Sequence, residues 1–159
     1  FGVSPDQVEV VVHRESIIHS MVEYVDNSVI AQLSVPDMRL CVQYALTGPV
    51  RTPSPLSTLD LTAMGKLTFF KPDMDTFILL PCAIRAIRAG GAVPAVLNAA
   101  NEVAVAHFLN HEITFQQISE TVSQVTEDLN AAAGTHDLEG ILAWDREARL
   151  VTEQYLTKA

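Results

Sequence analysis

Residues 19–39 read HSMVEYVDNSVIAQLSVPDMR, and this stretch decides the fold of the first part of the chain. Its apolar residues alternate with polar ones, a period-two pattern that is typical of half-buried strands. The alternating apolar positions are Val22, Tyr24, Val29, Ala31 and Leu33. Between them lie Asp26 and Asn27, which both tolerate the positive φ of a two-residue turn. We therefore expect a hairpin that leads into a loop at Pro36-Asp37-Met38, which either covers a bound ligand or is an ordinary surface loop.

The composition indicates a folded chain, part of whose surface is buried by a partner. Hydrophobic residues make up 48% of the 159 residues, whereas charged residues make up only 18%, and about a quarter is usual. We expect the missing charge to mark surface that a partner subunit or another domain buries. The net charge of −9 disfavours nucleic acid and anionic membranes as partners. An anionic substrate would need local positive charge or a metal ion.

The cysteines and the chain start carry weaker signals. Cys41 and Cys82 lie far apart among apolar neighbours, so we expect buried free thiols and no disulfide. No apolar run approaches the roughly 18 residues of a membrane helix. The first residues are neither basic nor followed by an apolar core, so we expect no signal peptide. A start at Phe-Gly predicts that the chain begins inside a longer protein.

The periodicity of the remaining segments predicts an α+β chain. We expect a buried strand over 8–13, a turn or short helix over 14–18, a helix over 38–46, a Pro-rich stretch over 48–55 and a short strand over 67–70. Helical periodicity predicts four helices, over 77–89, 94–109, 115–130 and 145–158, with Thr114 as an N-cap. The fold class is therefore the end of a sheet-containing domain over 1–47, a linker over 48–73 and a C-terminal four-helix bundle over 74–159.

Two motifs resemble one known family. HSMVEYVDNSVIAQLSVPDMR resembles the segment HSMVxYxDGSVxAQLGxPDMR of 1-deoxy-D-xylulose 5-phosphate reductoisomerase. The later segment GGAVPAVLNAANEVAV, residues 90–105, is similar to that family's GGTxPAVLNAANEVAV block. The resemblance extends from Val8 to the end of the chain, and it corresponds to the C-terminal part of the enzyme. Two long motifs in the right order are far more specific than either one alone.

The resemblance implies a role for four residues. His19 matches an active-site histidine, so it is expected to be catalytic. Ser16 matches a position that lines the substrate pocket, and Pro36 and Met38 match loop residues that pack against bound substrate. Neither proline nor methionine can exchange a proton, so their expected part is shape and the exclusion of water.

The resemblance also implies cofactors whose ligands lie upstream of Phe1. The family is NADPH-dependent and uses Mn²⁺ or Mg²⁺ to hold a small phosphorylated sugar substrate during its rearrangement and reduction. This chain has no GxGxxG fingerprint, and Trp144 is not the equivalent of the family's lid tryptophan. The chain also departs from the family pattern, with Arg14-Glu15 for Pro-Gln and with Leu40-Cys41 for a pair that often contains proline. Two further departures are Asn27 for the turn glycine and Ser34 for a glycine.

Other polar residues are assigned structural roles. His107 and His111 have the spacing of a zinc helix, but HFLNHE lacks the metalloprotease glutamate, and we expect solvated histidines. Asn98, Asn101 and Glu102 form either an acid–base or metal site, or a buried hydrogen-bond network that ties the helical domain to its neighbour. We favour the network.

These observations predict part of a reductoisomerase that is inactive alone, works as a homodimer and resides in the cytoplasm of a bacterium, with a plastid-type organelle left open. One alternative is a non-enzymatic protein-interaction module, which the lack of cofactor ligands favours for this chain. The other is a different dehydrogenase with the same layout. Neither alternative predicts both motifs.

Overall fold

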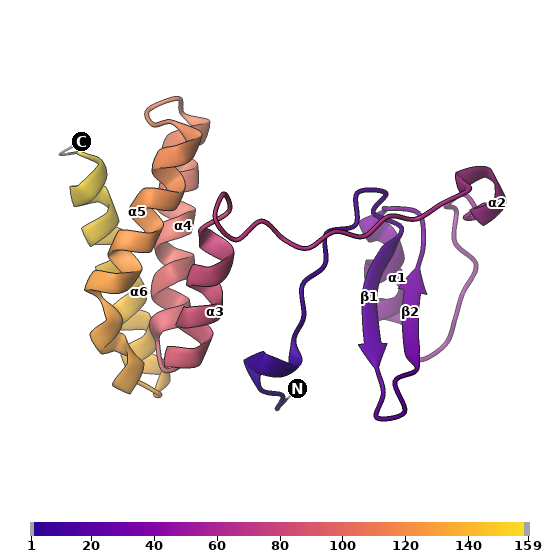
Figure 1. The fold of residues 1–159 in the computed structure, drawn as a ribbon. Coiled ribbons are helices and arrows are strands. Elements are labelled where there is room, and N and C mark those ends of the chain that lie inside the picture. Colours follow the sequence, from indigo (N-terminus) through magenta and orange to yellow (C-terminus); the bar gives the residue numbers. More distant parts are fainter. Residues whose placement is uncertain (1, 158–159) are drawn as a thin grey trace. The chain divides into compact units, whose positions relative to one another are not determined.

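The computed structural model of the chain describes residues 2–157. These residues form two compact units: a hairpin unit over residues 10–72, and a helical unit that combines residues 2–9 with residues 73–157 (Figure 1). The chain therefore contains a small sheet followed by helices, which confirms the α+β fold class. No described helix is both long and apolar enough to cross a membrane.

The hairpin unit is built on two antiparallel strands, β1 (Ile18–Glu23) and β2 (Val29–Leu33). The connection is longer than the predicted two-residue turn, because the pair that closes it is Tyr24 and Ser28, with a backbone N···O distance of 2.9 Å. Asn27 takes the positive φ, 63°, as the sequence predicted. The Asp26 carboxylate accepts hydrogen bonds from the Ser28 amide and hydroxyl, which stabilises this three-residue loop.

The register of the hairpin divides the apolar side chains between its two faces. Met21 pairs with Ala31 on one face, and Val22 pairs with Ile30 on the other. Among the five residues predicted to be half-buried, Val22, Tyr24, Val29 and Leu33 are exposed and only Ala31 is partly buried, so the predicted half-burial is wrong for both faces. A two-stranded ribbon has no second layer of its own to cover a face, and period-two patterning cannot reveal whether such a layer is present.

The strand predicted over residues 8–13 does not form. Only Val12 pairs, through two backbone hydrogen bonds of 2.9 Å with Phe70, and the valines of this run are exposed. The short strand predicted over 67–70 is reduced to the same bridge. A β-branched segment becomes a strand only where a neighbouring strand pairs with several of its residues, and here a single residue pairs.

Helix α1 (Met38–Thr47) follows the hairpin as predicted. Asp37 is its N-cap and accepts a hydrogen bond from the Arg39 amide. Cys41 is exposed on this helix, so its predicted burial is wrong, whereas the predicted burial of Cys82 is confirmed. A short helix, α2 (Leu61–Met64), interrupts the segment that was predicted to be a linker.

The helical unit contains the four predicted helices. They are α3 (Leu79–Ala89), α4 (Val93–Leu109), α5 (Phe115–Asp128) and α6 (Leu138–Leu156). Thr114 caps α5 through a capping box with Gln117, which confirms the predicted N-cap. Helix α6 begins seven residues before the predicted start, because Asp137 caps it by accepting a hydrogen bond of 2.8 Å from the Gly140 amide.

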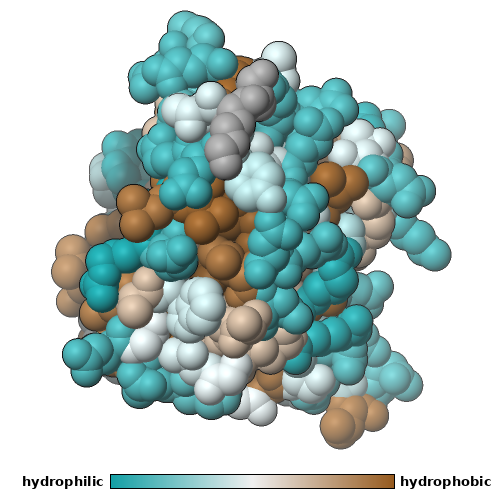
Figure 2. Space-filling view, turned by 90° about the vertical axis from the view of Figure 1, so that its left-hand side faces the viewer, coloured by the Kyte–Doolittle hydropathy of each residue, from teal (hydrophilic) through white to brown (hydrophobic). Residues whose placement is uncertain are grey.

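Helix α4 is the centre of this unit and packs against the other three helices. Its inward residues are small, and Ala99, Ala100 and Ala104 are fully buried. Small side chains let neighbouring helices approach closely, and the larger Val96, Val122 and Val125 fill the core between them. The face of the helical unit turned to the viewer in Figure 2 is mostly hydrophilic, with apolar side chains gathered near its middle.

Residues before the hairpin also belong to the helical unit. A single 3₁₀ turn, η1 (Pro5–Gln7), packs against α3, and Asp6 forms an ion pair of 2.5 Å with Arg88. A second 3₁₀ segment, η2 (Asn130–Gly134), connects α5 with α6 and lies against α4.

Candidate functional site

The structure brings together two of the four predicted site residues, Ser16 and His19. Ser16 lies in a tight turn with a left-handed φ of 52°, which is uncommon for a residue with a side chain. Its amide donates to the His13 carbonyl at 3.2 Å, and its own carbonyl lies 3.0 Å from Nε2 of His19. Non-glycine residues held in this region are often found at functional sites.

The other ring nitrogen of His19 faces the end of β2. Its Nδ1 atom lies 3.2 Å from the Ser34 hydroxyl and 3.2 Å from Oε1 of Gln32. The histidine ring therefore spans from the turn before β1 to the segment after β2. Ser34 is also held by its backbone, because its amide donates to the Ile17 carbonyl at 3.1 Å.

A carboxylate stabilises the turn that carries Ser16. Glu15 accepts hydrogen bonds from the amide and the hydroxyl of Thr68, at 3.1 and 2.6 Å, and lies 3.0 Å from Nδ1 of His13. The hydrogen bond from the Thr68 hydroxyl is the largest of the effects that lower the pKa of Glu15 to about 2. Nε2 of His13 is buried without a hydrogen-bond partner among the described residues, and the ring stacks on Phe69.

Pro36 and Met38 lie on the loop between β2 and α1. Asp37 binds the Arg39 guanidinium through both carboxylate oxygens, at 2.6 to 3.1 Å, and these bonds lower its pKa to about 2. This pair fixes the first turn of α1. Met38 occupies the first position of α1 and is 74% exposed, so its apolar side chain is available to a ligand or to another domain.

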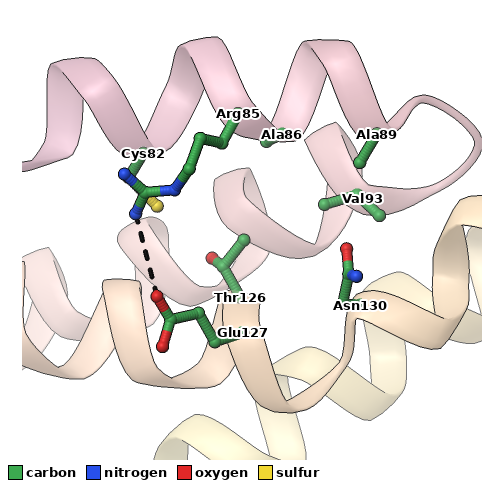
Figure 3. Close-up of a pocket in the computed structure, with 8 residues that line it drawn as sticks. All are labelled: Cys82, Arg85, Ala86, Ala89, Val93, Thr126, Glu127 and Asn130. Carbon is green, nitrogen blue, oxygen red and sulfur yellow. Dashed lines mark ion pairs between the residues drawn. The ribbon is translucent and has the colours of Figure 1, made fainter.

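The helical unit has a cavity of about 310 Å³ between α3, α4 and α5 (Figure 3). Arg85 and Glu127 point toward one another across it as an ion pair of 3.8 Å, and Cys82 and Thr126 lie on its walls. None of the predicted site residues lines this cavity, because all four belong to the hairpin unit.

Two polar residues of the second motif, Asn98 and Glu102, belong to a surface network. Glu102 accepts a hydrogen bond of 3.0 Å from Asn98 and pairs with Arg149 of α6 at 2.7 Å. Arg149 also binds Asp145, and these bonds raise its pKa. The network ties α4 to α6 within one unit. The predicted burial is wrong for Asn98 and Glu102, which are exposed.

His107 is paired and not merely solvated as predicted. Its Nδ1 lies 2.5 Å from a Glu112 carboxylate oxygen, and its Nε2 lies 2.9 Å from one of Glu153. The hydrogen bond with Glu153 is the largest of the effects that raise the pKa of His107. Within residues 2–157, no group of three or more histidine, cysteine or acidic side chains is placed to hold a metal ion.

The sequence profile of the DXP reductoisomerase C-terminal domain matches residues 33–151. The chain belongs to the DXP reductoisomerase family. It is 49% identical over 158 residues to the 1-deoxy-D-xylulose 5-phosphate reductoisomerase of Pseudomonas aeruginosa, and 48% identical over 158 residues to that of Endomicrobium trichonymphae. Both alignments cover 99% of this chain, but only 40% and 41% of those relatives.

Solved structures of DXP reductoisomerases have the same fold over the matched part. The Zymomonas mobilis enzyme in complex with NADPH is 40% identical with a TM-score of 0.83, and the match covers 93% of this chain and 39% of that one. A DOX-P reductoisomerase in complex with NADPH, fosmidomycin and magnesium is 37% identical with a TM-score of 0.88, and the match covers 92% of this chain and 38% of that one.

Within this member of the DXP reductoisomerase family, sequence reasoning missed the residues that surround the predicted site. Glu15 and Ser34 were noted only as departures from the family pattern, and Thr68 was not considered. Thr68 lies 53 residues from Glu15 along the chain, so no local pattern could have paired them. The departures themselves were the usable signal, because Glu15 introduces a charge and Ser34 introduces a hydroxyl close to predicted pocket residues.

Proposed function

We propose that this chain is the C-terminal part of an NADPH- and divalent-metal-dependent enzyme that converts 1-deoxy-D-xylulose 5-phosphate to 2-C-methyl-D-erythritol 4-phosphate. The observation that carries the proposal is the 49% identity to a named reductoisomerase across 99% of this chain. The hydrogen bond between His19 and the Ser16 carbonyl adds support, since it joins two residues that the resemblance assigns to one pocket.

In this proposal the hairpin unit supplies one wall of the substrate pocket. Met38 offers an exposed apolar surface, and Pro36 restricts the backbone of the loop that presents it. Ser16 and His19 supply polar groups beside this loop. Shape and water exclusion are what the wall contributes, since a methionine and a proline can neither donate nor accept a proton.

The described residues do not fit either cofactor. No cluster of metal ligands occurs among residues 2–157, and the sequence lacks a dinucleotide-binding glycine motif. We propose that the ligands of NADPH and of Mn²⁺ or Mg²⁺ belong to a part of the protein that precedes this chain. The chain alone is then inactive, and no step of the reaction is assigned to its residues.

We also propose that the protein works as a homodimer in the bacterial cytoplasm. The exposed apolar side chains of the hairpin, among them Val22 and Ile30, support an association surface. The relatives named above are bacterial.

The test compares this chain with a version extended upstream to the length of its relatives. Oxidation of NADPH is followed with 1-deoxy-D-xylulose 5-phosphate and Mn²⁺, and binding of fosmidomycin is followed by calorimetry. We expect turnover and tight binding in the extended form only. An extended form that folds but neither turns over nor binds fosmidomycin would contradict the proposal.

A second candidate is a protein-interaction module without catalysis. The exposed apolar faces of the hairpin favour it for the isolated chain, since exposed apolar surface often marks a binding site. The same comparison distinguishes the two, because a pure interaction module would show no NADPH oxidation at any length.

A further inference from the structure

Both ring nitrogens of His19 are engaged by the chain itself. Nε2 lies 3.0 Å from the backbone carbonyl of Ser16, and Nδ1 lies 3.2 Å from the hydroxyl of Ser34. A carbonyl oxygen can only accept, so Nε2 must carry the proton that makes the first hydrogen bond. A neutral imidazole has one N–H, and its Nδ1 is then an acceptor that the Ser34 hydroxyl can satisfy.

The remaining polar neighbour of Nδ1 presents an acceptor in its present orientation, which does not suit the neutral ring. Oε1 of Gln32 lies 3.2 Å away, but an amide oxygen is an acceptor and pairs with Nδ1 only when that nitrogen is protonated. A serine hydroxyl both donates and accepts. Ser34 is therefore the partner that suits the Nε2–H tautomer.

We propose that Ser34 is a positioning residue that holds the His19 ring in its Nε2–H tautomer and so ties the Ser16 turn to the loop that carries Pro36 and Met38. Ser34 can do this because its own backbone is fixed by the hydrogen bond to Ile17. The turn at Ser16, which has the left-handed φ of 52°, is held by His19 through the Ser16 carbonyl.

This role is particular to chains with serine at position 34. The family motif quoted above has a glycine there, which leaves Nδ1 without this hydroxyl. With Ser34 present, the lone pair of Nδ1 and the proton of Nε2 are both directed at the chain and not at a ligand. In this proposal His19 is itself a positioning residue, whereas the resemblance implies a catalytic one. The effect of Ser34 on substrate binding rests on the proposed function. The two hydrogen bonds of His19, to the Ser16 carbonyl and to the Ser34 hydroxyl, do not depend on it.

The first test is ¹⁵N NMR of the histidine side chains in the 159-residue chain at about pH 8, where an ordinary histidine is neutral. We expect a protonated Nε2 and an unprotonated, hydrogen-bonded Nδ1 for His19. In Ser34→Ala and Ser34→Gly, the Nδ1 signal should move to the position of an imidazole nitrogen without a hydrogen bond. Ser34→Thr keeps the hydroxyl and should restore the parent signal.

The coupling between the two segments is read from the same samples. Loss of the hydroxyl should shift the Ser16 amide and the Met38 methyl resonances together. Ser57→Ala is the matched control, because Ser57 is an exposed serine of the hairpin unit that lies far along the chain from Ser16, His19 and Ser34, and it should leave both signals unchanged.

Three results would overturn the proposal: a protonated Nδ1 in the parent, an Nδ1 signal that is the same in Ser34→Ala, or a Met38 methyl that ignores the substitution. None of them depends on activity. In the extended form we expect Ser34→Ala to lower kcat/KM about two- to tenfold, the range for one neutral hydrogen bond. Absence of turnover in the parent would instead contradict the proposed function and leave the NMR result in force.

Discussion

Gly91, in the turn between α3 and α4, is the position where one added methyl group should cost the most. Its φ is +55°, and a Cβ built there would lie 2.6 Å from the Ala133 carbonyl carbon and 2.7 Å from the Ala132 carbonyl oxygen. The nearest atom would be the Ala133 carbonyl oxygen, and ordinary contacts begin at 3.4 Å, so η2 would have to move away by more than about 0.8 Å. The Ala132 carbonyl also accepts the amide hydrogen of buried Ala92 at 3.0 Å.

Three costs therefore add in Gly91→Ala. The left-handed backbone costs about 1–2 kcal/mol for a residue with a side chain. Overpacking costs about 1–3 kcal/mol, and loss of the buried Ala92 hydrogen bond about 1–3 kcal/mol more. We expect the free energy of unfolding of the helical unit to fall by at least about 3 kcal/mol, a large share of the roughly 5–15 kcal/mol of a typical domain.

Trp144 allows the unfolding of the helical unit to be measured separately from that of the hairpin unit. It is the single tryptophan of the chain, it packs against the helical core, and its indole N–H donates to the Thr135 hydroxyl at 3.0 Å. Urea unfolding followed by its fluorescence reports on the helical unit, whatever the hairpin unit does. Gly134→Ala is the matched control, because a Cβ there meets nothing within 4 Å, and it should change the free energy by less than about 0.5 kcal/mol. Equal urea midpoints for the two variants would refute the reasoning.

Three further predictions concern titration, thiol reactivity and a helix start. The pKa of His107 is raised by Glu153 and Glu112, so its stabilising contribution should be complete below about pH 6.5 and should be lost as pH rises through the higher folded-state value. The difference in unfolding free energy between the parent and His107→Gln should therefore shrink over that window, and a constant difference would contradict the role of the two glutamates. Of the two thiols, exposed Cys41 should react quickly with a thiol reagent in the folded chain and buried Cys82 only on unfolding, so a fast phase that survives in Cys41→Ser would contradict the burial. Asp37→Ala should speed amide exchange at Arg39 and fray the start of α1. In the parent, lowering the pH through about 2, the pKa of Asp37, should also fray the start of α1, because the protonated carboxyl is a weaker acceptor. Unchanged exchange in the variant would show that the Asp37 N-cap is dispensable.

The features that were predictable from sequence are those set by residues close together in the chain. Thr114 as an N-cap and the 3.6-residue period after it predicted α5, and Asp26-Asn27 predicted the hairpin. Where the outcome depends on a distant neighbour, local pattern was insufficient. The valines of residues 8–12 have the composition of a strand, but only Val12 pairs, with Phe70. Cys41 has apolar neighbours in sequence but is exposed on α1.

The candidate site shows the same division. The family resemblance assigned Ser16, His19, Pro36 and Met38, and their roles stay predictions. What the motifs could not provide is the set of groups that hold them. Thr68 approaches Glu15 only because the chain returns past the Ser16 turn, and Ser34 meets His19 only because the hairpin register brings β2 alongside β1.

The way η1 joins α3 has a practical consequence. Since residues 2–9 pack with residues 73–157 while residues 10–72 form their own unit, the polypeptide passes from one unit to the other twice. A protease that cuts once, near Pro72, would leave residues 2–9 and the rest of the helical unit on different fragments. These fragments would share the Asp6–Arg88 ion pair and the packing of η1 on α3, and an exposed ion pair contributes only about 0–1 kcal/mol. A recombinant piece beginning at Asp73 would lack residues 2–9 and would expose the side of α3 on which η1 packs.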